Sequence, residues 1–308
     1  MTVAGTDIRS DRIARGIAFI LLSTFFTALQ DVTVKYASAD VTLWQLYVLR
    51  SLFVIPALLV IAFVWGDGAA TWRQSLRLWP MLRAALFVLM FVSMYAAIPV
   101  LPLSAVAAGI YTAPLFVAAL SAPLLGEPVR WRGVLAIAIG FAGVLVILRP
   151  GTEAFTWLML LPVIGGFFYA LSAIVTRSRC RSIPPVTLAV SLSIALLFTG
   201  AVITAALYIG QPAPAQVAIS PFLLSSWSAL DLSGWGVVAV LTMLMVGNGL
   251  VLPAAYQSAP SVIIATFDYN YLIFATLLGF VVFSEVPDLQ TVMGILMIAG
   301  AGLMIVRG

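Results

Sequence analysis

The chain has very few charged residues. Of its 308 residues, only 8% are Asp, Glu, Lys or Arg, whereas 63% are hydrophobic. Soluble domains average about 25% charged and about 45–50% apolar residues. So few charges could not cover a particle of this size in water. The composition therefore excludes an ordinary soluble protein and predicts that lipid solvates much of the surface.

Histidine is absent, and the chain has a single cysteine, Cys180. An internal disulfide, a histidine zinc site and catalysis by a Ser-His or Cys-His pair are therefore excluded. No glycine-rich stretch is followed by Lys-Ser or Lys-Thr, which argues against an ATP-binding loop. We expect no enzyme activity, no metal and no cofactor.

Long apolar runs separated by short polar breaks dominate the sequence. A membrane-spanning helix needs about 20 apolar residues. The first run begins near Ile13, after a polar tail at 1–12, and is too long for the core of a cleaved signal peptide. We expect ten spans, at 13–36, 41–64, 79–98, 103–125, 131–148, 155–176, 184–209, 234–255, 261–283 and 289–306. The long break at 210–233 is expected on the membrane surface.

The positions of Lys and Arg predict the orientation, because cytoplasmic loops are enriched in both. With a cytoplasmic N-terminus, only Lys35 and Arg149 face outward. Eleven face inward: Arg9, Arg12, Arg15, Arg73, Arg77, Arg130, Arg132, Arg177, Arg179, Arg181 and Arg307. We therefore expect a multi-pass protein of the cell inner (plasma) membrane with both termini cytoplasmic. Topology explains the net charge of +4, so no nucleic-acid partner is expected.

The two halves of the chain are related by an internal repeat. Phe25-Phe26-Thr27-Ala28-Leu29 matches Phe167-Phe168-Tyr169-Ala170-Leu171, and polar or proline matches continue along both halves. These further pairs are Lys35 with Arg177, Pro102 with Pro260, Tyr111 with Tyr269, Glu127 with Glu285, and Arg149 with Arg307. Five helices is an odd number, so the second copy must enter the membrane from the opposite side. We expect repeats at 13–150 and 151–308 and, between them, a site near the bilayer midplane that opens alternately to either side.

The chain resembles the drug/metabolite transporter superfamily, specifically its EamA-type family. The resemblance rests on the first-helix pattern ending in Lys35, on Arg50, on Tyr111-Thr112-Ala113-Pro114-Leu115-Phe116 and on Gly126-Glu127. It implies an all-α fold of two inverted five-helix repeats around a central cavity. It also implies export of amino acids or related metabolites, with the aromatic amino acid exporters of the YddG type most similar. The second half departs from the pattern at Ser284 and Leu272, and it has no counterpart of Arg50.

Two charges lie deep within predicted spans. Arg50 and Asp268 both approach the middle of an apolar core about 30 Å thick. A charge there costs at least about 2.5–3.5 kcal/mol, so each should face a partner or a wet cavity. We expect both to contribute to the substrate path. The alternatives are that Arg50 only holds helices together and that Asp268 is simply buried as the neutral acid.

Gating or coupling is assigned to Asp31, Lys35, Pro114 and Pro253. Asp31 and Lys35 are one helical turn apart, a spacing that also fits a simple ion pair at the rim. The two prolines interrupt or bound helices and are expected to act as hinges. Coupling to protons through Asp31 or Asp268 and uncoupled facilitation both remain open.

Aromatic and amide side chains complete the expected site. Aromatic walls with few polar groups suit an amphipathic substrate, although aromatic residues also gather at membrane interfaces. The candidates are Gln30, Trp44, Tyr47, Tyr95, Tyr111, Tyr169, Asn248 and Tyr271.

The expected function is a secondary transporter that exports small amphipathic metabolites, foremost aromatic and other apolar amino acids. A carrier of another metabolite or drug is the alternative. A channel and an intramembrane enzyme are less favoured, since the sequence has neither a filter-like run nor paired carboxylates in one helix register. The expected partners are a small-molecule substrate and the lipid bilayer, and the sequence leaves monomer and homodimer open.

Overall fold

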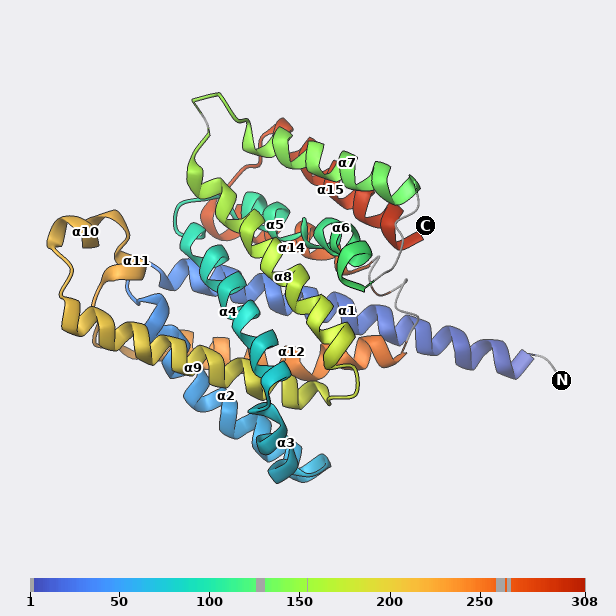
Figure 1. The fold of residues 1–308 in the computed structure, drawn as a ribbon, viewed down its shortest axis with the longest axis horizontal. Coiled ribbons are helices and arrows are strands. Elements are labelled where there is room, and N and C mark those ends of the chain that lie inside the picture. Colours follow the sequence, from blue (N-terminus) through green and yellow to red (C-terminus); the bar gives the residue numbers. More distant parts are fainter. Residues whose placement is uncertain (1–2, 126–130, 154, 259–263, 265–266, 308) are drawn as a thin grey trace.

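The computed structural model describes residues 3–125, 131–153, 155–258, 264 and 267–307, and the regular structure in these ranges is helical (Figure 1). The first half contains α1 (Val3–Ala37), α2 (Leu43–Trp65), α3 (Gly68–Ser75), α4 (Leu78–Ala97), α5 (Leu103–Ile110), α6 (Ala113–Leu125) and α7 (Trp131–Leu148). The second half contains η1 (Trp157–Met159), α8 (Leu160–Arg179), α9 (Pro185–Gly210), α10 (Pro214–Ile219), α11 (Pro221–Leu224), α12 (Leu232–Ser258), α14 (Asn270–Phe283) and α15 (Leu289–Arg307).

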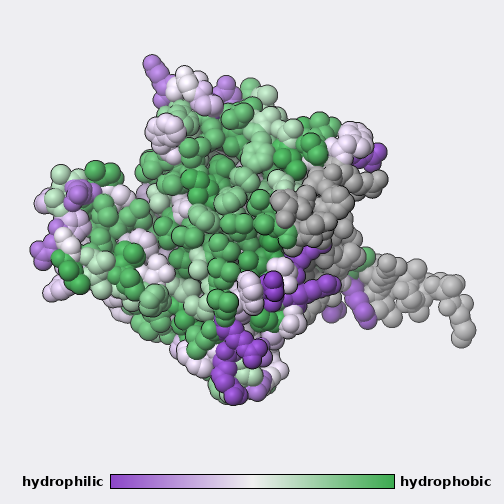
Figure 2. All heavy atoms as spheres, viewed as in Figure 1, coloured by the Kyte–Doolittle hydropathy of each residue, from purple (hydrophilic) through white to green (hydrophobic). Residues whose placement is uncertain are grey.

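Ten apolar helical segments are found, as the sequence predicted. In the described residues, 8 are long and apolar enough to cross a membrane, and Asn270–Phe283 and Leu289–Met304 are shorter apolar helices. Large hydrophobic side chains such as Phe63, Val281 and Leu232 are exposed. Figure 2 shows a broad hydrophobic surface, with hydrophilic residues gathered over α3 and at other edges. This is the surface of an all-α integral membrane protein.

Two boundaries differ from the sequence prediction. Helix α1 begins at Val3, so most of the expected tail at 1–12 continues the first helix. No proline separates the tail from the apolar run, and nothing local stops the helix there. The predicted span at 103–125 is interrupted, because α5 ends at Ile110 and α6 begins at Ala113. Pro114 is thus in the first turn of α6, where its missing N–H costs no helical hydrogen bond.

The helices pack largely as pairs from opposite halves of the chain. Helix α7 packs on α15, α4 on α8, α1 on α12 and α2 on α9. Figure 1 shows α7 and α15 together along one edge of the bundle. Glycine permits this close pairing: a Cβ added at Gly294 would lie 2.7 Å from the Gly143 carbonyl oxygen. These small residues therefore serve an interface within the monomer.

We call the end of the bundle where α1 ends and α2 begins the Lys35 end. Asp288, which precedes α15 at this end, accepts a hydrogen bond from the Thr291 N–H at 2.8 Å and so caps that helix. Arg149, which follows α7, forms an ion pair with Asp288. This contact joins the α7–α15 pair at the Lys35 end.

Candidate substrate site

A buried acid with two tyrosine donors lies among α1, α4 and α14. Asp31 of α1 is 3% exposed. The Tyr95 hydroxyl donates to its Oδ1 atom at 3.3 Å, and the Tyr271 hydroxyl donates to Oδ2 at 2.5 Å. Each carboxylate oxygen can accept a further hydrogen bond, because it carries two lone pairs. Asp31 is therefore held in place and still able to bind a donor from a ligand.

Arg50 is the eighth residue of α2 and is 3% exposed. Its Nε and Nη2 atoms have no hydrogen-bond partner among the described residues, and the Tyr47 hydroxyl is also unpaired there. The guanidinium carbon lies 5.9 Å from the centre of the Tyr47 ring. Nε–H and Nη2–H point in the same direction from the planar group, and this edge binds two acceptor atoms side by side. The edge therefore carries two buried donors without a partner among the described residues.

Arg50 interacts electrostatically with Asp31. The ion pairs among the described residues are Lys35–Glu285 and Arg149–Asp288, so Arg50 and Asp31 are not in direct contact. A positive and a negative group thus both lie buried in this part of the protein without forming a direct ion pair. This arrangement suits a ligand that offers acceptors to one and a donor to the other.

Tyrosines stand at two helix breaks that face each other. Tyr111 lies between α5 and α6, and Tyr269 immediately precedes α14. Their ring centroids are 5.4 Å apart, and Tyr111 also stacks on Tyr271 at 5.0 Å. The Tyr111 hydroxyl donates to the backbone carbonyl of Asp268 at 3.0 Å. A carbonyl at one break is therefore satisfied by a side chain from the other, as irregular backbone inside a membrane protein requires.

Tyr269 fits into a slot in α15. A Cβ added at Gly302 would lie 1.5 Å from the Tyr269 hydroxyl oxygen, so only glycine is compatible with this ring position. That hydroxyl has no hydrogen-bond partner among the described residues. Asp268, the neighbouring residue, interacts electrostatically with Tyr111, Tyr169 and Tyr269. The predicted Asp268 is thus part of a second acid–tyrosine group beside the first.

Aromatic rings form a continuous wall along the cluster. Neighbouring ring centroids are 5.9 Å apart for Trp44–Tyr47, 6.5 Å for Tyr47–Tyr95, 5.5 Å for Phe91–Tyr95, 6.2 Å for Phe87–Phe91 and 5.5 Å for Phe87–Tyr169. Such spacings are those of favourable edge or offset contacts. The wall brings together rings from α2, α4 and α8, and it includes four of the predicted aromatic residues.

Lys35 links three segments of the chain at this end of the cluster. Its ammonium forms an ion pair with Glu285 and donates to the Leu101 carbonyl at 2.7 Å. Glu285 in turn accepts from the Leu103 N–H at 2.8 Å. We call Lys35, Glu285 and these two backbone groups the latch. It joins the end of α1, the start of α5 and the residues after α14.

Several predicted residues serve other contacts. Asn248 accepts from Ser23 and donates to Thr27 at 3.1 Å, so its amide binds α12 to α1. Within the described ranges, the Gln30 side chain makes one long contact, 3.5 Å, to the Phe26 carbonyl. Trp44 donates to the Leu223 carbonyl at 2.7 Å and lies at the outer edge of the cluster. The side chain at the predicted hinge Pro253 lies outside the described residues.

Arg83 of α4 was missed at the sequence level. Its Nε donates to the Thr176 hydroxyl at 2.8 Å, and its guanidinium lies 4.5 Å from the centre of the Phe87 ring. It also interacts electrostatically with Tyr169. Arg83 is the fifth residue of the predicted span at 79–98, and a charge inside a span is the sequence signal that could have identified it.

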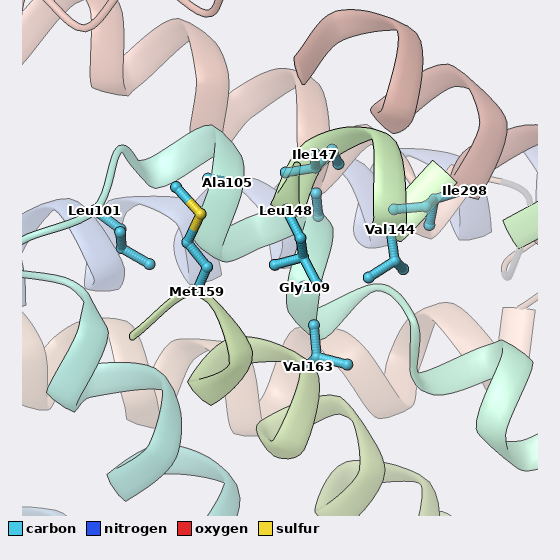
Figure 3. A pocket seen from close by; sticks show the side chains of 10 residues that line it. Leu101, Ala105, Gly109, Val144, Ile147, Leu148, Met159, Val163 and Ile298 are labelled. Carbon is cyan, nitrogen blue, oxygen red and sulfur yellow. The ribbon is translucent and has the colours of Figure 1, made fainter. Parts of the chain in front are cut away.

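A small cavity between α5, α7, α8 and α15 is unrelated to this cluster (Figure 3). It has a volume of about 10 Å³ and is lined only by apolar residues, among them Leu101, Val144, Met159 and Ile298. A space of this size holds at most about one water molecule. It reflects imperfect packing and is not a substrate site.

Residues 14–149 match the family model described as the EamA-like transporter family. The first half of the chain is therefore similar to the EamA-like transporter family. It is 29% identical over 301 residues to a riboflavin transporter of Rhizobium johnstonii, covering 96% of this chain and 89% of that protein. It is 25% identical over 293 residues to an S-adenosylmethionine uptake transporter of Rickettsia felis, covering 94% and 92%. It is 24% identical over 305 residues to the pseudopaline exporter CntI of Pseudomonas aeruginosa, covering 96% and 98%.

A solved crystal structure shares the fold, with a TM-score of 0.59 and 18% identity, covering 96% of the transporter and 97% of that chain. The predicted drug/metabolite transporter fold is therefore confirmed, as is a multi-pass membrane transporter of small metabolites rather than an enzyme. The names of these relatives lend no support to amino-acid export or to a specific YddG-type relationship. They favour the alternative of another metabolite.

Proposed function

We propose that the transporter carries a metabolite with a flat ring and a group that presents two adjacent hydrogen-bond acceptors. The observation that carries this proposal is the Nε–Nη2 edge of buried Arg50, which has no partner in the described part of the chain. A charge deep in a membrane protein is expensive unless it has a partner or faces water. A ligand bound across this edge supplies the partner during transport.

The aromatic wall and Asp31 define the rest of the ligand. A flat ring packs against Tyr47 and Tyr95, and a donor group on the ligand binds Asp31 beside the Tyr95 and Tyr271 hydroxyls. The riboflavin and S-adenosylmethionine transporters among the relatives are named for ring-bearing metabolites. We therefore place the substrate in this size range, with Arg50, Asp31 and the tyrosines as its contacts.

The inverted repeat supplies the proposed mechanism. The proposed repeat pairs α1 with α8 and α4 with α12. The contact between α1 and α12 then corresponds to the contact between α8 and α4. The helix breaks at Tyr111 and Tyr269 occupy corresponding positions of the two copies. Both observations support two equivalent halves that rock about a central site. In the conformation described, the latch holds the Lys35 end together. From the distribution of Lys and Arg, we propose that this end faces the outside of the cell.

The test is counterflow in liposomes with purified protein and labelled riboflavin, S-adenosylmethionine or tryptophan. We expect saturable counterflow with at least one of the three. Arg50→Gln should lower it by about 100-fold or more, because it removes a buried charged contact. Arg50→Lys keeps the charge without the two-donor edge and should recover only part of the activity. Arg132→Gln, the same change at an exposed position, is the control.

Two results would contradict the proposal. Wild-type counterflow by Arg50→Gln would remove Arg50 from the site. Absence of counterflow with all three compounds would exclude the proposed substrate class.

An amino acid is the second candidate substrate. The presence of Arg50 and Asp31 in the same aromatic cluster favours it, because a carboxylate suits the first and an ammonium suits the second. Tryptophan in the same assay tests it. Asp31→Asn and Asp268→Asn, compared at two pH values, test whether either acid couples transport to protons. An unchanged pH dependence in both variants would favour uncoupled facilitation.

A further inference from the structure

A groove lies at the Lys35 end, beyond the central cluster. It has a volume of about 650 Å³, within the range of small-molecule sites. Its walls come from the start of α2, the last turns of α9 and the segment after α11. The lining includes Trp44, Ala201, Thr204, Ala205, Ser226 and Trp227.

The groove exists because α9 extends past the start of α2. The two helices cross closely at Gly200, where an added Cβ would lie 2.8 Å from the Trp44 carbonyl oxygen. Beyond this crossing α9 continues to Gly210 and presents the small side chains of Ala201 and Ala205. Small residues opposite the two tryptophans leave the space open.

Both tryptophan rings are held in place by their own hydrogen bonds. Trp44 donates to the Leu223 carbonyl at 2.7 Å, and Trp227 donates to the Thr204 hydroxyl at 2.9 Å. The segment carrying Trp227 is fixed to α2 as well, since Gln45 donates to the Ser228 carbonyl at 2.8 Å and accepts from its N–H at 3.1 Å. These hydrogen bonds therefore position both rings along the groove.

Trp44 is shared between the groove and the central cluster. It lines the groove, and its ring lies edge-on to Tyr47 at 5.9 Å. Tyr47 is in turn 6.5 Å from Tyr95, which binds Asp31. A compound in the groove is thus separated from the central cluster by one indole ring.

We propose that this groove is a second binding site for the transported metabolite, which holds its flat ring between Trp44 and Trp227 before entry into, or after release from, the central cluster. The Thr204, Ser225 and Ser226 side chains offer hydrogen bonds to polar groups at the edge of such a ring. This inference rests on the proposed function for the identity of the ligand. The site itself is distinct from Arg50 and Asp31.

The test measures binding of labelled riboflavin, S-adenosylmethionine and tryptophan to the protein in lipid nanodiscs. Ala205 is exposed and lines the groove, whereas its neighbour Ala206 is exposed and does not. Ala205→Phe fills the groove, and Ala206→Phe is the matched control. For at least one compound, Ala205→Phe should weaken binding about three- to tenfold by displacing an aromatic contact, and Ala206→Phe should not.

The variant Arg50→Gln distinguishes binding to the groove from binding to the central cluster. Binding to the groove should persist in Arg50→Gln even though transport is lost, and Ala205→Phe should weaken this remaining binding. Trp227→Leu should act like Ala205→Phe, with Trp157→Leu, at a position 77% exposed, as the control. A failure of the counterflow assay with intact groove binding would overturn the proposed function alone.

Three results would overturn the inference. The first is that no compound binds the wild-type protein. The second is that Ala205→Phe and Trp227→Leu bind every compound as their controls do. The third is that Ala205→Phe leaves all three affinities unchanged but releases a phospholipid detected by native mass spectrometry, which would identify the groove as a lipid site.

Discussion

Lys35 and Arg50 are both cations on membrane helices, yet their surroundings differ. Lys35 has Glu285, the Leu101 carbonyl and the Phe283 ring, 5.3 Å away, as partners. Arg50 is more deeply buried, but two of its nitrogens have no partner among the described residues. Lys35 therefore stabilises one arrangement of the protein, whereas the open edge of Arg50 is suited to a molecule that comes and goes.

The largest effect on stability is expected from Lys35→Met. The change leaves Glu285 with only its hydrogen bond from Leu103, so unfolding should become easier by about 2–3 kcal/mol. Thermal unfolding in detergent micelles measures this. Lys35→Met combined with Glu285→Gln should recover part of the loss, because no unpaired charge remains. A melting temperature equal to that of the wild type would show that the latch contributes nothing.

Arg50→Met should behave in the opposite way. It removes a buried charge whose hydrogen-bonding capacity is not met, so stability should be unchanged or higher by up to about 1 kcal/mol. Asp31 keeps both tyrosine donors in this variant. The same melting experiment applies. Destabilisation as large as that of Lys35→Met would support the other reading of Arg50, as a residue that only holds helices together.

The smallest effect is expected at the exposed pair of Arg149 and Asp288. The Arg149 hydrogen bond, together with the Thr291 contacts, lowers the pKa of Asp288 to about 2. A carboxyl whose pKa is lower in the folded state stabilises it above the unfolded pKa of about 4, and this is lost as pH falls from about 4 to about 2.

Asp288→Asn should therefore reduce the fall in melting temperature over this interval. The difference is small because exposed ion pairs contribute about 0.2–1 kcal/mol. Equal pH dependence in variant and wild type would show that the Asp288 contacts do not affect stability.

The sequence allowed the spans and the central charges to be predicted for simple physical reasons. Arg50 and Asp268 stand out in long apolar runs, because a charge there is costly unless it has a partner or faces water. The repeat paired Tyr111 with Tyr269, but it did not predict that each stands at a helix break, because the predicted spans were continuous there. Membrane helices also need their apolar length whatever their neighbours are, so the ten spans could be placed one by one.

Contacts between distant residues could not be predicted. The latch joins positions 35 and 285, and no local pattern specifies that pairing. Asn248 was expected at the substrate, but its amide is taken up by Ser23 and Thr27 on α1. The groove depends on how far α9 extends past α2, which is a property of their crossing at Gly200.

The slot at Gly302 has a mechanical consequence. Tyr269 lies at the helix break before α14, and its ring fits against Gly302 of α15. Helix α15 is joined to α7 along their glycines and by Arg149 and Asp288, at one edge of the bundle (Figure 1). If Tyr269 moves, either α7 and α15 must move with it or its ring must leave the slot at Gly302. Bilayer thickness acts on the tilt of such helices. A change in thickness that tilts α7 and α15 should therefore also act on the helix break at Tyr269.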